Sequence, residues 1–270
     1  MRELCFIILM IILFVILKKN KKNNIERFSN INNFNKNYKD WFNNNIDLFY
    51  INLDISHERR KKMEKQLSKL NINYNRYNAY NGNLIDKKFN NKLIQDFNTI
   101  NYNSHIYKNK KGSLGNYISQ LTCWYDFYLN SNKKYLMIME DDILINNNFN
   151  TENIKKIINS VNGIDWTMIK LFCFDKREGN VQNKFLIKST CNTKNYRHPK
   201  NTGMQCYILN KKNIKKLIQD MLPIKNDTFD WKVKYIMLKH NIFITHENYV
   251  ETPDHNNSSD RKLIDKQKKI

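Results

Sequence analysis

Glycine and proline are scarce in this sequence, with six glycines and three prolines among 270 residues. Collagen-like and low-complexity chains depend on these residues, so both classes are excluded. Hydrophobic residues make up 41% of the chain and aromatic residues 13%, which also excludes a fully disordered protein. The length suffices for one sizeable core, and we therefore predict one domain with small appendages.

Closely spaced cysteine pairs are absent as well. The five cysteines are scattered along the chain and form no Cys-x-x-Cys pair; they are Cys5, Cys123, Cys173, Cys191 and Cys206. The sequence therefore predicts no zinc site. An odd, scattered set is typical of free buried thiols, so no disulfide framework is supported and the cellular compartment stays open.

Acidic residues are few relative to basic ones: 25 Asp and Glu face 46 Lys and Arg, for a formal net charge of +21. An excess of this sign fits an anionic partner, such as nucleic acid, a membrane surface or a phosphorylated substrate. The lysines are spread along the whole chain, however, which is typical of a solvated surface. No nucleic-acid-binding motif is present, so we expect no nucleic-acid partner.

A long apolar run occurs at the N-terminus, over Leu4–Leu17. It is short for a membrane-spanning helix, and no small-residue cleavage site follows it. Lysines in the next segment, KKNKKNN, can extend their charged ends to the interface and lengthen the span. We predict an uncleaved single-pass membrane anchor at residues 1–17, with its topology open, and an Asn/Lys-rich tether at residues 18–45.

Strand-like and helix-like segments alternate from Ile46 onward. Short β-branched and aromatic runs predict strands at 46–54, 135–139, 165–174, 204–210 and 242–247, and a short strand followed by a turn at 75–82. Amphipathic spacing predicts helices at 56–72, 113–130 and 211–221. A strand, a helix and a strand thus open the domain. This alternation predicts an α/β domain at 46–260 with a mostly parallel central sheet, followed by a basic tail at 261–270.

Three adjacent acids, Glu140, Asp141 and Asp142, follow the apolar strand YLMIM. In open α/β sheets, ligands bind beyond the carboxyl ends of the strands. Carboxylates packed together repel one another unless a cation neutralises them, and oxygen ligands on a short turn suit Mg²⁺ or Mn²⁺. The natural co-ligand of such an ion is a diphosphate. An ordinary exposed turn without a ligand is the alternative.

Four segments of the chain carry a recognisable pattern. They are Phe49–Gly82, with Asn52-Leu53-Asp54, Arg59-Arg60, Ala79 and Gly82; Gly112–Trp124, with Gly115, Ser119 and Trp124; Tyr135–Phe149, with the three acids; and Asn201–Ile218, with Gly203, Tyr207 and Leu217. In this order and spacing they resemble glycosyltransferase family 25, the lipooligosaccharide and procollagen galactosyltransferase family. The second segment departs from the family pattern, because Ser113, Asn116 and Gln120 stand where Glu, Cys and His are usual.

The resemblance implies a GT-A fold, which is a single Rossmann-like α/β domain. It also implies an inverting, metal-dependent transfer of a hexose, usually galactose, from a UDP-sugar to a hydroxyl of a glycan or glycoprotein acceptor, as in lipopolysaccharide biosynthesis. Asp142 would then bind Mn²⁺ or Mg²⁺, and Glu140 would face the nucleotide ribose or ligate the ion. Asp141 would support the turn or add a ligand.

The remaining donor contacts implied by the resemblance come from the first segment. Arg59 and Arg60 would donate charge-assisted hydrogen bonds to the diphosphate, or else form an exposed helix turn. Asn52 and Asp54 would lie near the nucleotide base.

Inversion also requires a carboxylate that deprotonates the acceptor hydroxyl. Asp230 is the candidate base and Asp227 the second choice; a helix N-cap is the alternative role for both. A late histidine often adds a metal ligand in GT-A enzymes, and here that would be His255 or His246.

The departures at Ser113, Asn116 and Gln120 leave a second function open, namely a catalytically inactive glycosyltransferase-like binding or adhesion module. Glutamine in place of histidine can keep a hydrogen bond but cannot transfer a proton. The Asn/Lys-rich composition and the short N-terminal anchor resemble proteins of large DNA viruses, which would place the chain in a host membrane or a virion.

Overall fold

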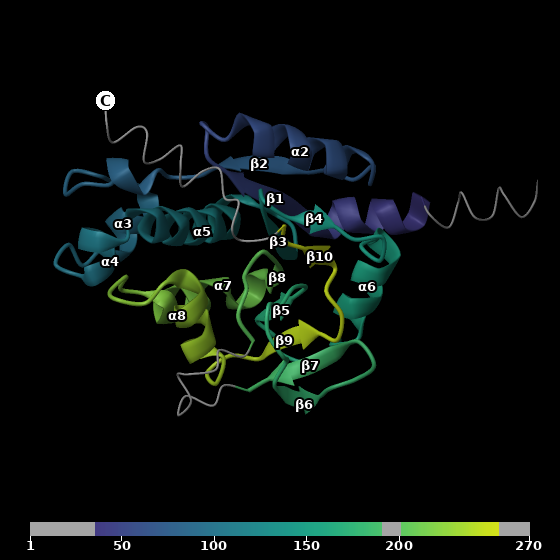
Figure 1. Ribbon diagram of the computed structural model, residues 1–270. Coiled ribbons are helices and arrows are strands. Elements are labelled where there is room, and N and C mark those ends of the chain that lie inside the picture. Colours follow the sequence, from purple (N-terminus) through teal and green to yellow (C-terminus); the bar gives the residue numbers. More distant parts are fainter. Residues whose placement is uncertain (1–35, 191–200, 254–270) are drawn as a thin grey trace, which may run out of the picture.

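The computed structural model describes residues 36–190 and 201–253 (Figure 1). The predicted anchor at 1–17, most of the tether at 18–45 and the tail at 261–270 lie outside this part of the chain. Within residues 36–190 and 201–253, no helix is both long enough and apolar enough to cross a membrane.

An eight-stranded sheet forms the centre of the fold, in the order β2-β1-β3-β8-β5-β9-β7-β6. Its strands are β1 (Ile46–Asn52), β2 (Asn75–Asn78), β3 (Tyr135–Glu140), β5 (Met168–Lys170), β6 (Gly179–Val181), β7 (Leu186–Ser189), β8 (Cys206–Asn210) and β9 (Ile242–Thr245). Two short strands, β4 (Leu144–Ile145) and β10 (Val250–Glu251), form a separate antiparallel pair. The α/β class predicted from the sequence is confirmed.

The sheet is mixed, which corrects the prediction of a mostly parallel one. Strand β1 is parallel to β2 and β3, and β5 is parallel to β9. Strand β8, however, lies antiparallel between β3 and β5, and β7 is antiparallel to both β6 and β9. The alternation of strands and helices could not reveal this, because a buried strand reads as the same apolar run in either direction.

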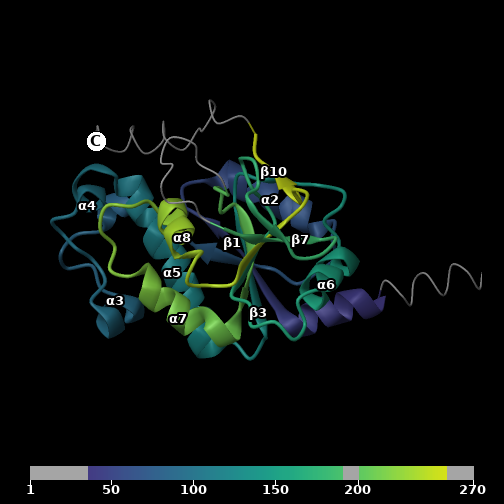
Figure 2. The same cartoon turned by 90° about the horizontal axis from the view of Figure 1, so that it is seen from below.

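Helices cover both faces of the sheet (Figures 1 and 2). They are α2 (His57–Ser68), α3 (Lys92–Phe97), α4 (His105–Asn109), α5 (Lys111–Asn130), α6 (Thr151–Asn159), α7 (Lys211–Met221) and α8 (Phe229–Ile236), with a 3₁₀ turn η1 (Gly82–Leu84). Residues 36–45 are helical as well. The predicted helices at 56–72, 113–130 and 211–221 correspond to α2, α5 and α7.

Two hydrophobic clusters, one on each face, hold these layers together. Helices α5, α7 and α8 bury their apolar stripes on one face, where Trp124 and Leu121 of α5 are fully buried. On the other face, Met63 of α2 and Ile157 of α6 pack in a second cluster, which also buries Phe42 from the helical segment before β1. Burial of apolar surface on both faces is what stabilises a three-layer fold of this kind.

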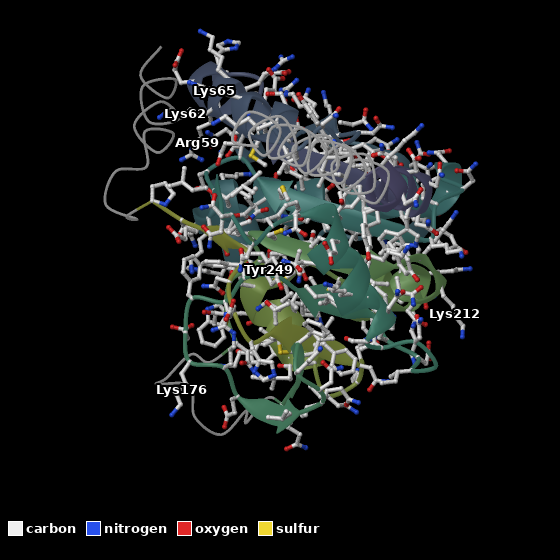
Figure 3. The ribbon with its side chains drawn as sticks, turned by 90° about the vertical axis from the view of Figure 1, so that its right-hand side faces the viewer. Arg59, Lys62, Lys65, Lys176, Lys212 and Tyr249 are labelled. Atoms are coloured by element: carbon white, nitrogen blue, oxygen red, sulfur yellow. The ribbon has the colours of Figure 1, made fainter. Side chains whose placement is uncertain are left out.

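One edge of the sheet collects the carboxyl ends of β1, β3, β5 and β9, and the antiparallel β8 adds its amino end there. Figure 3 shows this separation: Arg59 and Lys176, which follow β1 and β5, lie toward one side, and Lys212, which follows β8, lies on the opposite side. The acids Glu140–Asp142 follow β3 and so lie at the first edge.

Candidate active site

A cavity of about 190 Å³ opens at this edge of the sheet. It is lined by the loops after β1, β2 and β3 and by the first turns of α5; the lining residues include Ile51, Leu53, Arg59, Ala79, Tyr80, Asn81, Gly82, Asn83, Gly112, Asn116, Ser119, Glu140, Asp141 and Asp142. Three of the four segments singled out in the sequence therefore meet around one cavity.

Two glycines let the loop after β2 contact α5 backbone to backbone. A Cβ on Gly115 would lie 2.5 Å from the carbonyl oxygen of Tyr80 and 2.7 Å from the nitrogen of Gly82. A Cβ on Gly82 would lie 1.7 Å from the carbonyl oxygen of Lys111. Ser119 secures the same contact, because its hydroxyl accepts a hydrogen bond of 2.8 Å from the backbone nitrogen of Tyr80. The cavity wall at 79–83 therefore depends on these small residues.

We expect Gly115→Ala to lower the thermal midpoint of unfolding, because backbone atoms cannot move aside as a flexible side chain can. Overpacking of this kind costs about 1–3 kcal/mol or more. Gly112→Ala is the matched control on the same helix, since a Cβ there meets nothing within 4 Å; it should leave the unfolding midpoint unchanged or raise it. Equal melting behaviour of the two variants would contradict the close-approach argument.

Asp141 supports the acidic turn from within. Its Oδ2 accepts a hydrogen bond of 2.6 Å from Nδ2 of Asn52, and its Oδ1 lies 3.1 Å from Nη1 of Arg59. Asn52 is itself buried and also accepts a hydrogen bond from Arg76. The ends of β1 and β3 are thus tied together, so Asn52 contacts the acidic turn in this structure and not the cavity.

The two arginines after β1 have different surroundings. Arg59 lines the cavity, and its Nη1 lies 3.4 Å from a carboxylate oxygen of Asp142 as well as close to Asp141. Arg60 lies on the exposed side of α2, paired with Glu64 at 3.0 Å. Only Arg59 of the predicted pair is therefore placed to contact a ligand in the cavity.

Asp54 lies outside the cavity lining, in the exposed turn that follows β1. Its carboxylate forms a 2.5 Å ion pair with Arg76 of β2 and accepts a 2.9 Å hydrogen bond from Asn78. These hydrogen bonds, above all the one from Arg76, hold the pKa of Asp54 below its usual range. The sequence analysis missed Arg76, because nothing in the segment NRYN distinguishes it from a surface arginine.

Glu140 and Asp142 line the cavity on either side of Asp141 in the sequence. Burial raises the pKa of Glu140 well above its usual range, and the carboxylates of Asp142 and Asp230 raise it further. The side chain of Asn116, one of the residues that depart from the family pattern, donates a hydrogen bond to Glu140 and opposes this shift. The site therefore concentrates negative charge that a bound cation would relieve.

Within the described residues, no three His, Cys, Asp or Glu side chains are grouped so as to hold a metal ion. Mg²⁺ is commonly bound through one or two carboxylates together with substrate phosphates, and it keeps several waters. Asp142, whose side chain is 39% exposed, and Glu140 fit that mode. The residues present thus suit an ion shared with a diphosphate and not a closed protein cage.

Neither of the two histidines proposed as late metal ligands is seen in a position to bind a metal within the described residues. His255 lies outside it. His246 has its Nε2 3.0 Å from the carbonyl oxygen of Asn183, so this nitrogen serves as a donor and is not free to bind a metal.

Asp230 lies in the first turn of α8 and is partly buried, with Thr228 at the N-cap position. Neither Asp230 nor Asp227 is therefore the N-cap residue. Burial raises the pKa of Asp230, whereas the ammonium of Lys170 and the backbone N–H of Gly203 lower it. Asp230 also contributes to the raised pKa of Glu140, which places it electrostatically within the site.

Gln120, which stands where the family usually has histidine, is fully buried. Its Oε1 accepts a 2.5 Å hydrogen bond from the hydroxyl of Tyr207, which in turn accepts one of 2.8 Å from Trp124. The Nε2 of Gln120 has no hydrogen-bond partner among the residues that the structure describes. The position keeps a structural hydrogen bond, and Tyr207 and Trp124 of the predicted pattern belong to the same network.

Lys170 was also missed by the sequence analysis. It is the last residue of β5 and is only 1% exposed. A lysine inside the apolar run TMIKLFCF was the available signal, because buried lysines are rare unless they are paired.

Comparison with known proteins agrees with the arrangement of these segments. The profile of glycosyltransferase family 25, described as an LPS biosynthesis protein family, matches residues 45–235. No curated protein matches the sequence.

Two solved structures show a distant structural similarity to this chain. A glycosyltransferase involved in the glycosylation of the major capsid of PBCV-1 superposes with a TM-score of 0.45 and 5% identity, over 84% of this chain and 100% of that chain. A 4-diphosphocytidyl-2C-methyl-D-erythritol synthase from Anaerococcus prevotii superposes with a TM-score of 0.39 and 10% identity, over 84% and 100%. The match over residues 45–235 covers most of the chain, so this protein belongs to glycosyltransferase family 25 and is a glycosyltransferase.

Proposed function

We propose that this glycosyltransferase transfers a hexose from a UDP-sugar to a hydroxyl of a glycan or glycoprotein, with inversion at the anomeric carbon and on a GT-A-type fold. The observation that carries the proposal is the joint lining of one cavity by Arg59 and by the acids Glu140–Asp142. A cationic side chain beside carboxylates that can share a metal ion is suited to a sugar diphosphate and not to a neutral ligand.

The size and lining of the cavity suggest how the donor binds. Pockets that enclose a whole drug-sized ligand measure about 300–1,000 Å³, so a cavity of about 190 Å³ takes only part of a nucleotide-sugar. The apolar Ile51 and Leu53 and the amides of Asn81 and Asn83 suit the base. The diphosphate then lies toward Arg59 and the acidic turn.

The amino end of α5 supports the same orientation. Gly112, in the first turn of this 20-residue helix, lines the cavity. The first amide groups of a helix have no carbonyl partner within the helix, and the helix dipole favours anions at that end. A phosphate near Gly112 would gain from both effects.

The ion suited to this site is Mn²⁺ or Mg²⁺, held by Asp142 and Glu140. Such an ion supplies Lewis-acid stabilisation of the charge that develops on the leaving diphosphate. Asp141 holds the turn in place through Asn52 and Arg59. Arg59, with its guanidinium near both aspartates, stabilises the same leaving charge from the protein side.

Asp230 is the proposed general base. Its carboxylate takes the proton of the acceptor hydroxyl while the hydroxyl oxygen forms a bond to the anomeric carbon of the donor. The bond from that carbon to the diphosphate oxygen breaks, and UDP leaves with the electron pair. Attack from the face opposite the leaving group inverts the configuration.

A panel of nucleotide-sugars tests the proposal directly. We expect UDP release from one UDP-hexose, abolished by EDTA and restored by Mn²⁺ or Mg²⁺, because ion and diphosphate bind the site together. UDP affinity measured by calorimetry should also rise when Mn²⁺ is added. A catalytically inactive binding module would bind UDP and release none from any donor, and release that is insensitive to EDTA would contradict the metal assignment.

A further inference from the structure

Lys170 is a buried cation behind the proposed active site. It pairs with Tyr207 in the register of β5 and β8, so the two side chains lie on the same face of the sheet, the face covered by α5, α7 and α8. Burial of a lysine costs free energy unless hydrogen bonds and an opposite charge compensate it. The contacts of Lys170 therefore indicate its role.

The ammonium of Lys170 is attached to the loop that precedes β8. Its Nζ donates a 2.5 Å hydrogen bond to the carbonyl oxygen of Asn201. Asn201 is itself in the left-handed region, with φ of 61°, and its amide donates to the carbonyl of Glu178 and the hydroxyl of Ser189. The loop is thus fixed from several sides, and Lys170 is one of its anchors.

The same loop supports the proposed base. Gly203, two residues after Asn201, donates its backbone N–H to the carboxylate of Asp230. Lys170 thus acts on Asp230 in two ways. Its hydrogen bond to Asn201 holds the loop that carries Gly203, and its positive charge stabilises the carboxylate. Asp230 is the acid that the ammonium of Lys170 stabilises in its charged form.

Lys170 contributes a buried positive charge to surroundings that include Asp230 and Asp175. Burial lowers the pKa of Lys170 to about 8, and the nearby Cys173, Asp230 and Asp175 oppose that shift. The negative charge of Asp230 raises the pKa of Glu140 and that of the buried Tyr207 hydroxyl. A further negative charge beside these groups is disfavoured unless a buried cation offsets it.

We infer that Lys170 is a positioning residue for the transfer reaction: it holds the loop at Asn201–Gly203 and supplies the positive charge that keeps Asp230 ready to accept a proton. The inference rests on the proposed function, in which Asp230 is the base. It predicts an effect on the chemical step and none on donor binding, because Lys170 does not line the donor cavity.

The test is a double-mutant cycle on kcat with Lys170→Met and Asp230→Asn. A role worth about 1.4–2.7 kcal/mol corresponds to a loss of about 10- to 100-fold in kcat. Lys170→Met should show this loss with an unchanged KM for the UDP-sugar and an unchanged UDP affinity. In the Asp230→Asn background it should cause no further loss.

Lys170→Gln separates charge from hydrogen bonding, because its amide can still donate to the carbonyl of Asn201. We expect it to fold and to lose kcat like the methionine variant. Lys211→Met is the control: Lys211 also donates to a backbone carbonyl, that of Ser131, at the opposite edge of the sheet, and its loss should leave kcat unchanged.

Three outcomes would overturn the inference: full kcat in Lys170→Gln, equal losses for Lys170→Met with and without Asp230→Asn, or a raised KM with an unchanged kcat. A different result marks failure of the proposed function itself, namely wild-type kcat in Asp230→Asn alone. The two failures are therefore distinguishable.

Discussion

Asp230→Asn is expected to reduce kcat by about 10²- to 10⁴-fold, which is the usual contribution of a general base. The carboxamide keeps the shape of the side chain and can still accept the hydrogen bond from Gly203, but it cannot take a proton from the acceptor hydroxyl. UDP affinity should stay close to that of the wild type, because Asp230 is not among the residues that line the donor cavity. Steady-state transfer assays and calorimetry with UDP measure the two quantities.

Asp227→Asn provides the matched control for the base. Asp227 lies just before α8, three residues from Asp230, and it raises the pKa of Tyr117, which places it near a different part of the core. We expect Asp227→Asn to retain most of the activity. If Asp227→Asn were inactive and Asp230→Asn active, the base would be Asp227, the second choice from the sequence.

Asp142→Asn should abolish metal-enhanced UDP binding and reduce kcat by at least about 100-fold, since Lewis-acid stabilisation contributes several kcal/mol. All three acids line the cavity, but the side chain of Asp142 is 39% exposed against 10% for Asp141, and both oxygens of Asp141 are occupied by Asn52 and Arg59. UDP titrations with and without Mn²⁺ measure how much the metal ion strengthens UDP binding. Thermal melting shows whether the fold is retained.

Asp165→Asn is the control for removal of a surface charge. Asp165 precedes β5 at the opposite edge of the sheet and pairs loosely with Lys212 at 3.7 Å. Asp165→Asn should change neither the increase in UDP affinity caused by Mn²⁺ nor kcat. An Asp142→Asn variant that still binds UDP more tightly with Mn²⁺ would remove Asp142 from the proposed metal site.

Much of the candidate site follows from the order of residues along the chain. The apolar strand before Glu140 and the opening strand before Asn52 each had to end at an edge of an α/β sheet, and parallel neighbours bring such ends together. The spacing of apolar residues at 113–130 likewise predicted the helix α5, because that pattern depends only on the helical period. These are local properties of the sequence. The family resemblance then indicated that the segments serve one function.

Other features required the folded chain, because they depend on contacts between distant segments. The reversed direction of β8 brings the preceding loop, whose Gly203 donates to Asp230, to this edge of the sheet, and an apolar run does not record strand direction. The separation of Arg59 from Arg60 depends on which face of α2 meets the acidic turn.

The same holds for Gly82 and Gly115. In the sequence they are two separate motif glycines, and in the folded chain they form one close backbone contact. Residue types and their periodicity establish which segments are strands, helices and polar turns, because those follow from local backbone geometry. Which charges become neighbours is set by long-range packing, and the proposed chemistry of this glycosyltransferase depends on those neighbours.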